Sequence, residues 1–154
     1  MSTDPVNARI LIVDDQEIHI RLLRHILTDA GFTNITGYTD PREAVACFQR
    51  LEPDIVLLDL MMFPLDGFTV MRRMQEQMEE DDVVPIVFLT ADVNPEHRHR
   101  ALSLGAKDFL EKPFDHDEVV LRIRNLLETR LLHKKLRELA AGRSTRDRAA
   151  ALGG

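Results

Sequence analysis

Three short, uninterrupted apolar segments constrain the fold of this chain more than any other feature. They are Ile10–Val13, Ile55–Leu58 and Ile86–Leu89, and each is rich in β-branched residues and followed directly by a polar residue. Continuous hydrophobicity is typical of strands buried on both faces of a parallel sheet, whereas strands with one solvated face alternate. Asn34–Tyr38 and Asp108–Leu110 are weaker strand candidates. The sequence therefore predicts a five-stranded parallel sheet.

Helical patterns lie between the predicted strands. Asp40-Pro41 and Asn94-Pro95 each place an N-cap residue before a proline at the first helical position, and Asp115 can cap the last helix. Five strands that alternate with five helices predict a doubly wound α/β domain with helices on both faces of the sheet. The apolar residues at helical spacing are, in chain order, Ile18, Leu22, Ile26 and Ala30; Ala44, Val45 and Phe48; Phe68, Met71, Met74 and Met78; Ala101 and Leu102; and Val119, Ile123, Leu126 and Leu127.

Length and charge limit the class of protein. The 154 residues suffice for one domain of ordinary size, and the net charge is −6. Residues 1–116 carry 11 Lys/Arg and 21 Asp/Glu, whereas residues 117–154 carry 9 and 5, so the charge is −10 in the body and +4 at the end. An acidic body argues against direct binding to nucleic acid. We interpret the basic end as a solvated helix, with an attachment point as the alternative.

The sequence gives no sign of secretion or of membrane insertion. Cys47 is the single cysteine, so an internal disulfide is excluded, and we expect it to be a buried small hydrophobic residue. The apolar segments fall far short of the roughly 20 residues that a membrane span needs. The N-terminal residues lack the basic-then-apolar order of a signal peptide. We therefore expect a cytoplasmic protein that does not bind membranes.

Polar residues follow four of the predicted strands at the point where each strand ends. They are Asp14 and Asp15, Asp59, Thr90, and Lys112. Ligands of open parallel sheets collect outside the carboxyl ends of the strands, so these side chains are expected to converge. Three converging carboxylates with one lysine are electrostatically costly unless a cation joins them. Mg²⁺ suits such a site because it prefers oxygen ligands and often binds carboxylates together with phosphate.

These residue types favour phosphoryl transfer. A carboxylate can attack phosphorus to give an acyl phosphate, and the transferred group needs neutralising charge and hydrogen-bond donors. Asp59 can supply the nucleophile, Asp14 and Asp15 the metal ligands, Lys112 the counter-charge and Thr90 a hydroxyl donor.

At these residues the sequence resembles the receiver domains of two-component response regulators, of which the single-domain chemotaxis regulators are the simplest. The matching segments are residues 11–15 (LIVDD), 54–62 (DIVLLDLMM) with 65–67 (LDG), 88–91 (FLTA) and 101–114 (ALSLGAKDFLEKPF). The resemblance covers about residues 8–127. We take residues 1–127 as the domain and residues 128–154 as a helical extension or linker with a flexible end. It implies the flavodoxin-like strand order 2-1-3-4-5 and a phosphorylation-dependent signalling switch.

The resemblance also implies roles for single residues. Asp59 would accept a phosphoryl group from a histidine kinase or phosphotransfer protein. Asp14, Asp15 and Asp59, with the backbone carbonyl of Met61, would bind Mg²⁺ or Mn²⁺. The chain would then be no enzyme toward other substrates and would catalyse only its own Mg²⁺-dependent phosphorylation and autodephosphorylation.

The remaining implied roles concern the response to phosphorylation. Thr90 and Lys112 would contact the phosphoryl oxygens, and Phe109 falls at the position of the family's aromatic switch. Pro113 is the residue that the family holds in a cis peptide bond. Movement of Thr90 and rotation of Phe109 would remodel the face formed by the fourth helix, fifth strand and fifth helix. Phe109 lacks the hydroxyl of the commoner tyrosine, so its switch would be steric.

Two positions depart from the family pattern or tune it. The loop after Asp59 usually reads D-x-x-M-P, but here Pro64 arrives one residue late, which is expected to alter the loop shape. Phe63 and Leu65 in this loop are either an exposed recognition element or part of the loop packing. Asp92 lies where family members tune their own dephosphorylation.

The C-terminal helical pattern extends beyond the domain. It continues to about Ala141, where residues 142–144 are expected to break it, and its leucine seam slips by one position at Leu132. Self-association through this helix or the fourth-helix face is one hypothesis. The helix also resembles linkers to cyclic-di-nucleotide phosphodiesterase or cyclase domains, so the chain could be the receiver piece of a longer regulator with a fused output domain or act on a separate downstream protein.

Other interpretations stay open or are disfavoured. An aspartyl-phosphate phosphatase of the haloacid dehalogenase class is the enzymatic alternative, but its D-x-D pattern is lacking because position 61 is Met. The His97–Arg100 segment is a poor zinc site, because residues two apart on a helix diverge. The acidic residues 79–82 are interpreted as a solvated loop, with a kinase docking patch as the alternative.

Overall fold

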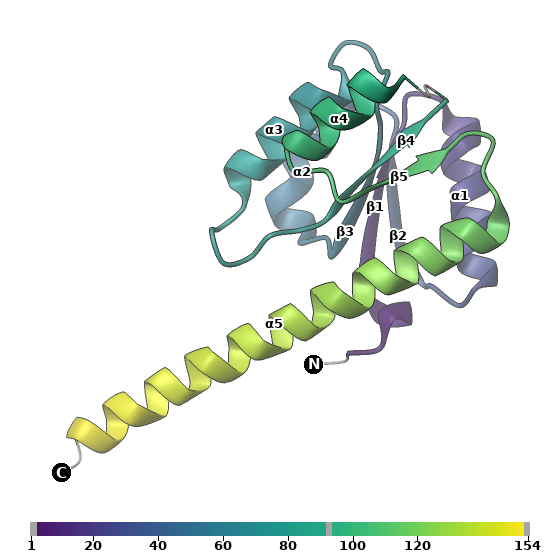
Figure 1. Cartoon of the computed structure of the whole chain (residues 1–154). Coiled ribbons are helices and arrows are strands. Elements are labelled where there is room, and N and C mark those ends of the chain that lie inside the picture. The colour runs from purple at the N-terminus through teal and green to yellow at the C-terminus, as the bar shows by residue number, and fades with distance from the viewer. Residues whose placement is uncertain (1–2, 92–93, 153–154) are drawn as a thin grey trace.

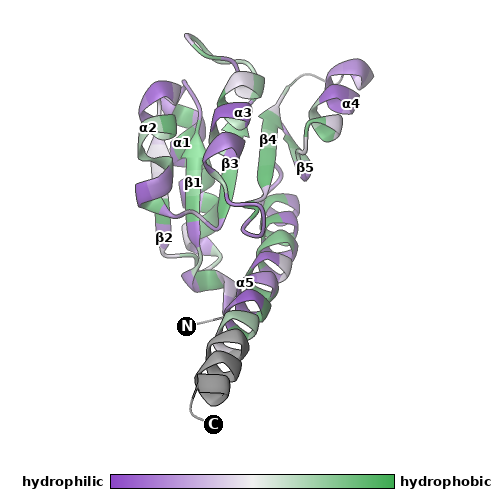
Figure 2. Cartoon of the chain, turned by 90° about the vertical axis from the view of Figure 1, so that its left-hand side faces the viewer, coloured by the Kyte–Doolittle hydropathy of each residue, from purple (hydrophilic) through white to green (hydrophobic). Residues whose placement is uncertain are grey.

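The parallel sheet forms the centre of the protein. The computed structural model describes residues 3–91 and 94–152, with side chains described over residues 3–91 and 94–142. All strand pairs are parallel, and the order β2-β1-β3-β4-β5 confirms the predicted topology. The strands are β1 (Arg9–Val13), β2 (Asn34–Tyr38), β3 (Ile55–Asp59), β4 (Ile86–Thr90) and β5 (Asp108–Glu111). In Figure 2 the central strands β1 and β4 are coloured as hydrophobic.

Helices cover both faces of the sheet, as predicted. After a short 3-10 turn, η1 (Pro5–Asn7), the helices are α1 (Glu17–Asp29), α2 (Pro41–Leu51), α3 (Gly67–Gln77), α4 (Pro95–Ser103) and α5 (His116–Leu152). One apolar core joins the sheet to α1 and α5, and a second joins it to α2, α3 and α4. Figure 1 shows α1 and α5 on one side of the sheet and the other three helices on the opposite side. This three-layer arrangement leaves the carboxyl edge of the sheet for a site.

The predicted helix caps are present. The side chains of Asp40 and Asn94 accept hydrogen bonds from the backbone N–H groups of Arg42 and Glu96 at 2.9 Å. Asp115 accepts from the N–H of Glu118 at the same distance. Local sequence thus determines where these helices begin.

The buried face of α1 follows the apolar residues noted in the sequence only in part. Ile18 and Leu22 are exposed, and the helix buries Ile20, Leu23, Ile26 and Leu27 instead. The segment carries two overlapping apolar stripes, and helical spacing alone does not choose between them. The close contact of Ile20 with β2 selects the buried stripe. Ile20 packs directly on Gly37, where a Cβ atom would lie 2.5 Å from Cγ2 of Ile20. Of the apolar residues at helical spacing in this segment, Ile26 is thus buried and Ala30 packs at the margin of the core, whereas Ile18 and Leu22 are not part of it.

The apolar residues of the α3 segment and Cys47 differ in how deeply they are buried. Met71 and Met74 are fully buried, while Phe68 and Met78 pack at the margin of the second core. Cys47 is only half-buried, and its Sγ accepts a hydrogen bond from Arg50 at 3.3 Å. The methionines therefore fill the core, while the cysteine lies at its edge.

The last helix is longer than predicted. α5 runs without interruption from His116 to Leu152, so the break expected at residues 142–144 was wrong. One glycine costs a helix about 1 kcal/mol, which neighbouring helix formers such as Ala140 and Ala141 offset. The division between domain and extension at residue 127 stays a prediction. Leu131 lies in the first core, so α5 continues to contact the body beyond that position.

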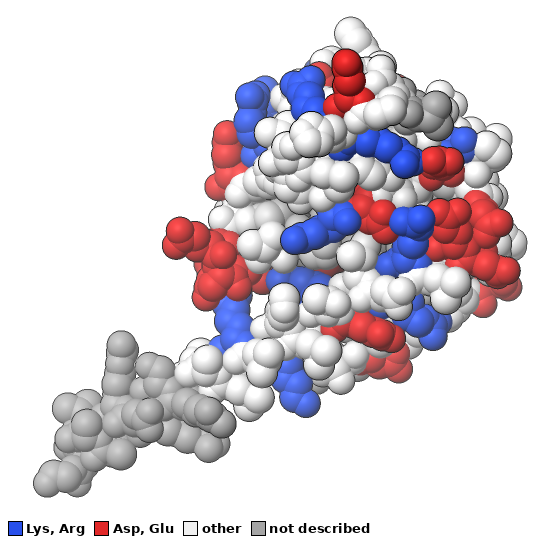
Figure 3. Space-filling view, in the orientation of Figure 1, with Lys and Arg blue, Asp and Glu red and all other residues white. Residues whose placement is uncertain are grey.

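Basic residues of α5 bind the acidic loop between α3 and β4. Arg130 donates to Asp82 at 2.6 Å, and Arg137 contacts the carboxylates of Glu79, Asp81 and Asp82 at 2.6–3.2 Å. These contacts lower the pKa of Asp82 against the effect of its burial. Figure 3 shows acidic atoms of the body beside basic atoms at the base of the helix. The loop is exposed but is more than a solvated loop, because it holds the helix.

The slipped leucine seam corresponds to two faces of α5. Leu127 and Leu131 are buried against the body, whereas Leu132, Leu136 and Leu139 are exposed by more than half. The slip therefore marks the change from a face that packs within the chain to one that points away from it. In the described part of the chain, no helix is both long and apolar enough to cross a membrane.

The contact between Arg130 and Asp82 is expected to stabilise the fold. The side chain of Arg130 is only 7% exposed, so Arg130→Ala leaves Asp82 without its nearest cation. We expect the free energy of unfolding to fall by about 1–3 kcal/mol, measured by urea denaturation. Lys135→Ala, at an exposed position of the same helix, is the matched control and should change stability little. Equal losses in both variants would contradict a stabilising contact.

Candidate functional site

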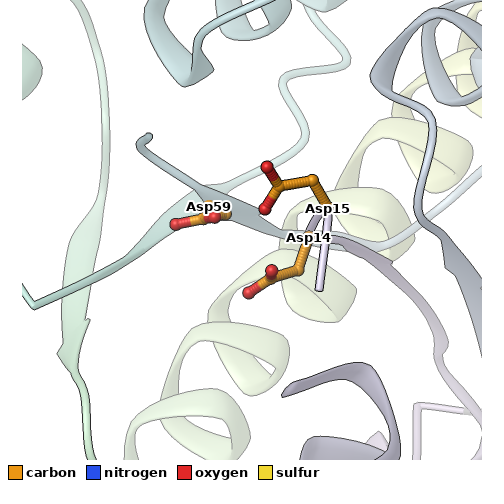
Figure 4. Close-up of side chains that lie close together, drawn as sticks. All are labelled: Asp14, Asp15 and Asp59. Atoms are coloured by element: carbon orange, nitrogen blue, oxygen red, sulfur yellow. The ribbon is translucent and has the colours of Figure 1, made fainter. Parts of the chain in front are cut away.

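The carboxyl edge of the sheet gathers the residues singled out in the sequence. Asp14 and Asp15 follow β1, Asp59 and Thr90 end β3 and β4, and Lys112 follows β5. Oxygen atoms of Asp14, Asp15 and Asp59 all lie within 4.8 Å of one another. Figure 4 shows the three carboxylates at the ends of the two adjacent strands. Parallel strand ends thus place distant segments in one acidic cluster.

Burial makes this cluster electrostatically demanding. Asp14 is fully buried and Asp59 is 5% exposed, whereas Asp15 faces solvent. The Nζ atom of Lys112 lies 3.0 Å from Oδ2 of Asp14 and 3.3 Å from Oδ1 of Asp59. One ammonium group therefore offsets two buried carboxylates and a third nearby.

The pKa of Asp59 is raised in this environment. Burial, and then the charge of Asp14, raises the pKa to about 6, against the lowering effect of Lys112. Burial disfavours the charged form of a carboxylate, and a like charge adds to that effect. The site is therefore suited to a further cation.

Asp14 also determines how α1 begins. Its Oδ1 accepts a hydrogen bond from the N–H of Gln16 at 2.9 Å, and its Oδ2 faces Lys112 and Nδ1 of His19. His19, in the first turn of α1, also lies 3.0 Å from Nζ of Lys112. Sequence reasoning missed His19. Its place five residues after Asp14, in the first turn of the following helix, was the available signal.

Thr90 is buried at the end of β4, and Phe109 of β5 lies beneath the guanidinium group of Arg98. Thr90 is buried, and its carbonyl accepts a hydrogen bond from the N–H of Lys112 at 2.9 Å. The ring of Phe109 is 8% exposed and lies 6.1 Å from that of Phe88. The guanidinium group of Arg98 lies 5.3 Å from the centroid of the Phe109 ring and forms an ion pair with Glu111. Arg98 was also missed by sequence reasoning, because its contact spans α4 and β5.

The loop after Asp59 is open at its tip. Met61 and Phe63 are exposed, the latter by 83%, whereas Leu65 packs against the second core. Of the two residues, Phe63 is thus exposed as a recognition element would be, whereas Leu65 is part of the loop packing. The Phe63–Pro64 and Lys112–Pro113 peptide bonds are both cis. Asp92 lies outside the described residues.

Gly67, the first residue of α3 after this loop, is required to be a glycine because it lies against the end of β3. The N–H of Gly67 donates to the carbonyl of Leu60 at 2.8 Å. A Cβ atom at this position would lie 2.5 Å from the carbonyl oxygen of Asp59. The first turn of α3 therefore approaches the backbone of Asp59 as closely as a residue without a side chain allows.

The acidic cluster fits a hard divalent cation. Its donors are carboxylate oxygens, the ligand type preferred by Mg²⁺ and Mn²⁺. Within the described residues, this is the one group of three or more metal-ligating side chains that lie close together.

Comparison with known families agrees with this geometry. Residues 10–124 match the family described as "Response regulator receiver domain". The chain belongs to this family. As a receiver domain, it is 40% identical over 136 residues to the response regulator PleD of Caulobacter vibrioides, a match that covers 88% of this chain and 30% of PleD.

Solved structures place the fold in the same family. The receiver domain is similar to the chemotaxis protein CheY4 of Vibrio cholerae, with a TM-score of 0.72 and 28% identity over 78% of this chain and 98% of that one. NtrX from Brucella abortus matches with a TM-score of 0.76 and 31% identity, over 86% of this chain and 29% of NtrX. The chain spans 30% to about half of the length of the curated relatives that it matches.

Because the pKa of Asp59 is raised, we expect its ionised form to lower the free energy of unfolding of the metal-free protein at neutral pH. Between about pH 4 and pH 6 the unfolded chain has lost a proton that the folded protein keeps, so stability falls as the pH rises through this range. Asp59→Asn removes the buried charge and should raise the free energy of unfolding by about 1–3 kcal/mol at neutral pH without metal. The gain should vanish below pH ~4, as measured by urea denaturation across pH.

Asp40→Asn is the matched control for that measurement. Asp40 is an exposed N-cap whose pKa is lowered by Arg42, and Asn caps equally well. This variant should show no gain at neutral pH. A gain in Asp40→Asn equal to that in Asp59→Asn, or none in either variant, would contradict the electrostatic explanation.

Proposed function

We propose that the chain is a phosphorylation-dependent signalling switch in which Asp59 accepts a phosphoryl group from a histidine kinase or phosphotransfer protein. The observation that carries the proposal is the buried Asp59 carboxylate, held between an acidic cluster and Lys112 at the carboxyl edge of the sheet. In the donor, a P–N bond to histidine breaks as a carboxylate oxygen of Asp59 forms the new P–O bond. The histidine nitrogen keeps the electron pair of the broken bond, and the product is an acyl phosphate.

The metal in this proposal is Mg²⁺ or Mn²⁺. Asp14, Asp15 and Asp59 would hold it together with the backbone carbonyl of Met61. When bound, the ion neutralises charge that develops on the phosphoryl oxygens. The oxygen-only donor set and the raised pKa of Asp59 support this assignment.

Two further residues would contact the phosphoryl group. Lys112 already lies within 3.3 Å of Asp59 and supplies a cation, and the hydroxyl group of Thr90 supplies a donor from the end of the adjacent strand β4. Donors and charges that are in place before the group arrives stabilise the transition state without reorganisation. The same set would serve autodephosphorylation, so the chain acts on its own phosphoryl group and on no other substrate.

The response would be relayed through the face formed by α4, β5 and α5. Phe109 is enclosed between Phe88 and the guanidinium group of Arg98, which also pairs with Glu111. Thr90 lies next to Glu111 in the register of β4 and β5. Movement of Thr90 toward the phosphoryl group would therefore disturb the strand that carries both Phe109 and Glu111.

The partners follow from the same features. A kinase or phosphotransfer protein would approach the carboxyl edge, and the output would be a downstream protein or a domain fused after α5. The matches to only part of longer relatives, such as PleD and NtrX, support the interpretation that the chain is the receiver piece of a longer regulator. The exposed Leu132, Leu136 and Leu139 support self-association with a second copy through α5.

Phosphorylation of Asp59 is tested by intact mass. The full chain with Mg²⁺ and the small phosphodonor acetyl phosphate should gain one phosphoryl mass, and chelation of the metal should suppress the gain. Asp59→Asn should abolish it, while the control Asp40→Asn should leave it intact. A wild-type chain that stays unmodified under saturating donor and Mg²⁺ would sink the proposal.

The relay is tested by amide hydrogen exchange. A fluoroberyllate mimic bound at Asp59 should change exchange in residues 95–111 and leave α2 unchanged, because only the former segment contains the Arg98–Phe109–Glu111 contacts. Arg98→Ala should increase exchange in the same segment without the mimic. Protection that changes equally over both segments would count against a localised relay.

A further inference from the structure

His19 is a residue of the site to which the proposed function gives no role. Its Nδ1 atom lies 3.0 Å from Nζ of Lys112 and 3.1 Å from Oδ2 of Asp14. Its side chain is 25% exposed, and its ring meets that of Phe114 edge-on at a centroid distance of 6.3 Å. The imidazole is therefore held by α1 on one side and by the segment after Lys112 on the other.

Three polar atoms surround the ammonium group of Lys112, which carries three protons. Its Nζ atom lies 3.0 Å from Oδ2 of Asp14, 3.0 Å from Nδ1 of His19 and 3.3 Å from Oδ1 of Asp59. The side chain of Lys112 is only 14% exposed. A proton without a protein acceptor would therefore have little access to water, which is costly for a charged donor.

The two contacts of Nδ1 correspond to different tautomers of His19, because Nδ1 cannot donate to Asp14 and at the same time accept from Lys112. Donation to Asp14 would leave the buried ammonium group of Lys112 without His19 as an acceptor. Acceptance from Lys112 requires a neutral ring with its proton on Nε2, and Oδ2 of Asp14 then still accepts from Lys112.

We propose that His19 is a positioning residue that fixes Lys112 for contact with the phosphoryl group on Asp59. The inference rests on the proposed function, because a fixed Lys112 matters only if a phosphoryl group arrives there. The contacts with Asp14 and His19 do not involve Asp59, so they would remain available when Asp59 is modified. The third proton of Lys112 stays directed at the reacting carboxylate, which reduces the reorganisation needed for the reaction.

Three variants separate this role from a general effect on α1. His19→Asn keeps an acceptor near the position of Nδ1, whereas His19→Leu keeps a similar size without an acceptor. His25→Leu makes the same change at an exposed position of the same helix and is the matched control.

The first measurement needs no phosphorylation. Nitrogen-15 NMR of the full chain, above the ordinary pKa of histidine, should show His19 with its proton on Nε2 and a slowly exchanging ammonium signal from Lys112. The Lys112 signal should be lost in His19→Leu and kept in His19→Asn and His25→Leu. A proton on Nδ1 of His19 would overturn the inference.

The second measurement is the rate of phosphorylation by acetyl phosphate with saturating Mg²⁺. His19→Leu should lower the rate constant at saturating donor about tenfold, the effect of one lost hydrogen bond to a charged group, with an unchanged half-saturation constant. His19→Asn should restore most of the rate, and His25→Leu should match wild type. A wild-type rate in His19→Leu would overturn the inference, whereas a wild-type chain that takes no phosphoryl group would overturn the proposed function instead.

Discussion

The ammonium group of Lys112 is the charge on which the carboxyl edge of the sheet depends. It is the counter-ion of two buried carboxylates, Asp14 and Asp59, with Asp15 close by. A single positive charge does not balance the three, so the charge of Asp14 adds to the larger effect of burial in raising the pKa of Asp59. A cation that enters, or a change at Asp59, therefore alters a balance that Asp14 also links to the start of α1. The described residues of the site thus carry more negative than positive charge.

A different balance holds at the opposite edge of the sheet. There the buried Asp54 accepts from Lys134 of α5 at 2.8 Å and from the N–H of Arg9, so its charge is satisfied. The acidic loop of residues 79–82 meets Arg130 and Arg137 of the same helix. The acidic body and the basic end, which the sequence shows as separate regions, are thus partly one set of intramolecular ion pairs. The structure satisfies its charges at the edge away from the site and leaves them unbalanced at the site.

Sequence reasoning succeeded where one local signal decides the outcome. The apolar segments gave the strands, the capping residues gave the helix starts, and the strand ends gave Asp14, Asp59 and Lys112. Helical spacing did not identify the buried face of α1, where two apolar stripes overlap and contact with Gly37 decides between them. Sequence reasoning missed the contacts of His19 with Lys112 and of Arg98 with Phe109, because each contact joins two different elements of the fold. The spacing of His19 from Asp14 was a signal that it lies near the site, but not that it contacts Lys112.

The two faces of α5 suggest how such a site can act at a distance. The helix begins four residues after Lys112, and its first seam, which includes Ile123 and Leu131, is buried in the core. Arg130 and Lys134 then fix the direction in which it leaves the body. Among the residues whose side chains the structure describes, the last exposed leucine is Leu139, about 35 Å from the helix start at 1.5 Å per residue. Because a continuous helix is stiff, a small tilt at its first turn displaces the leucine face by more than it displaces the site. The ion pairs with the acidic loop would oppose such a tilt, because they hold the helix against the body.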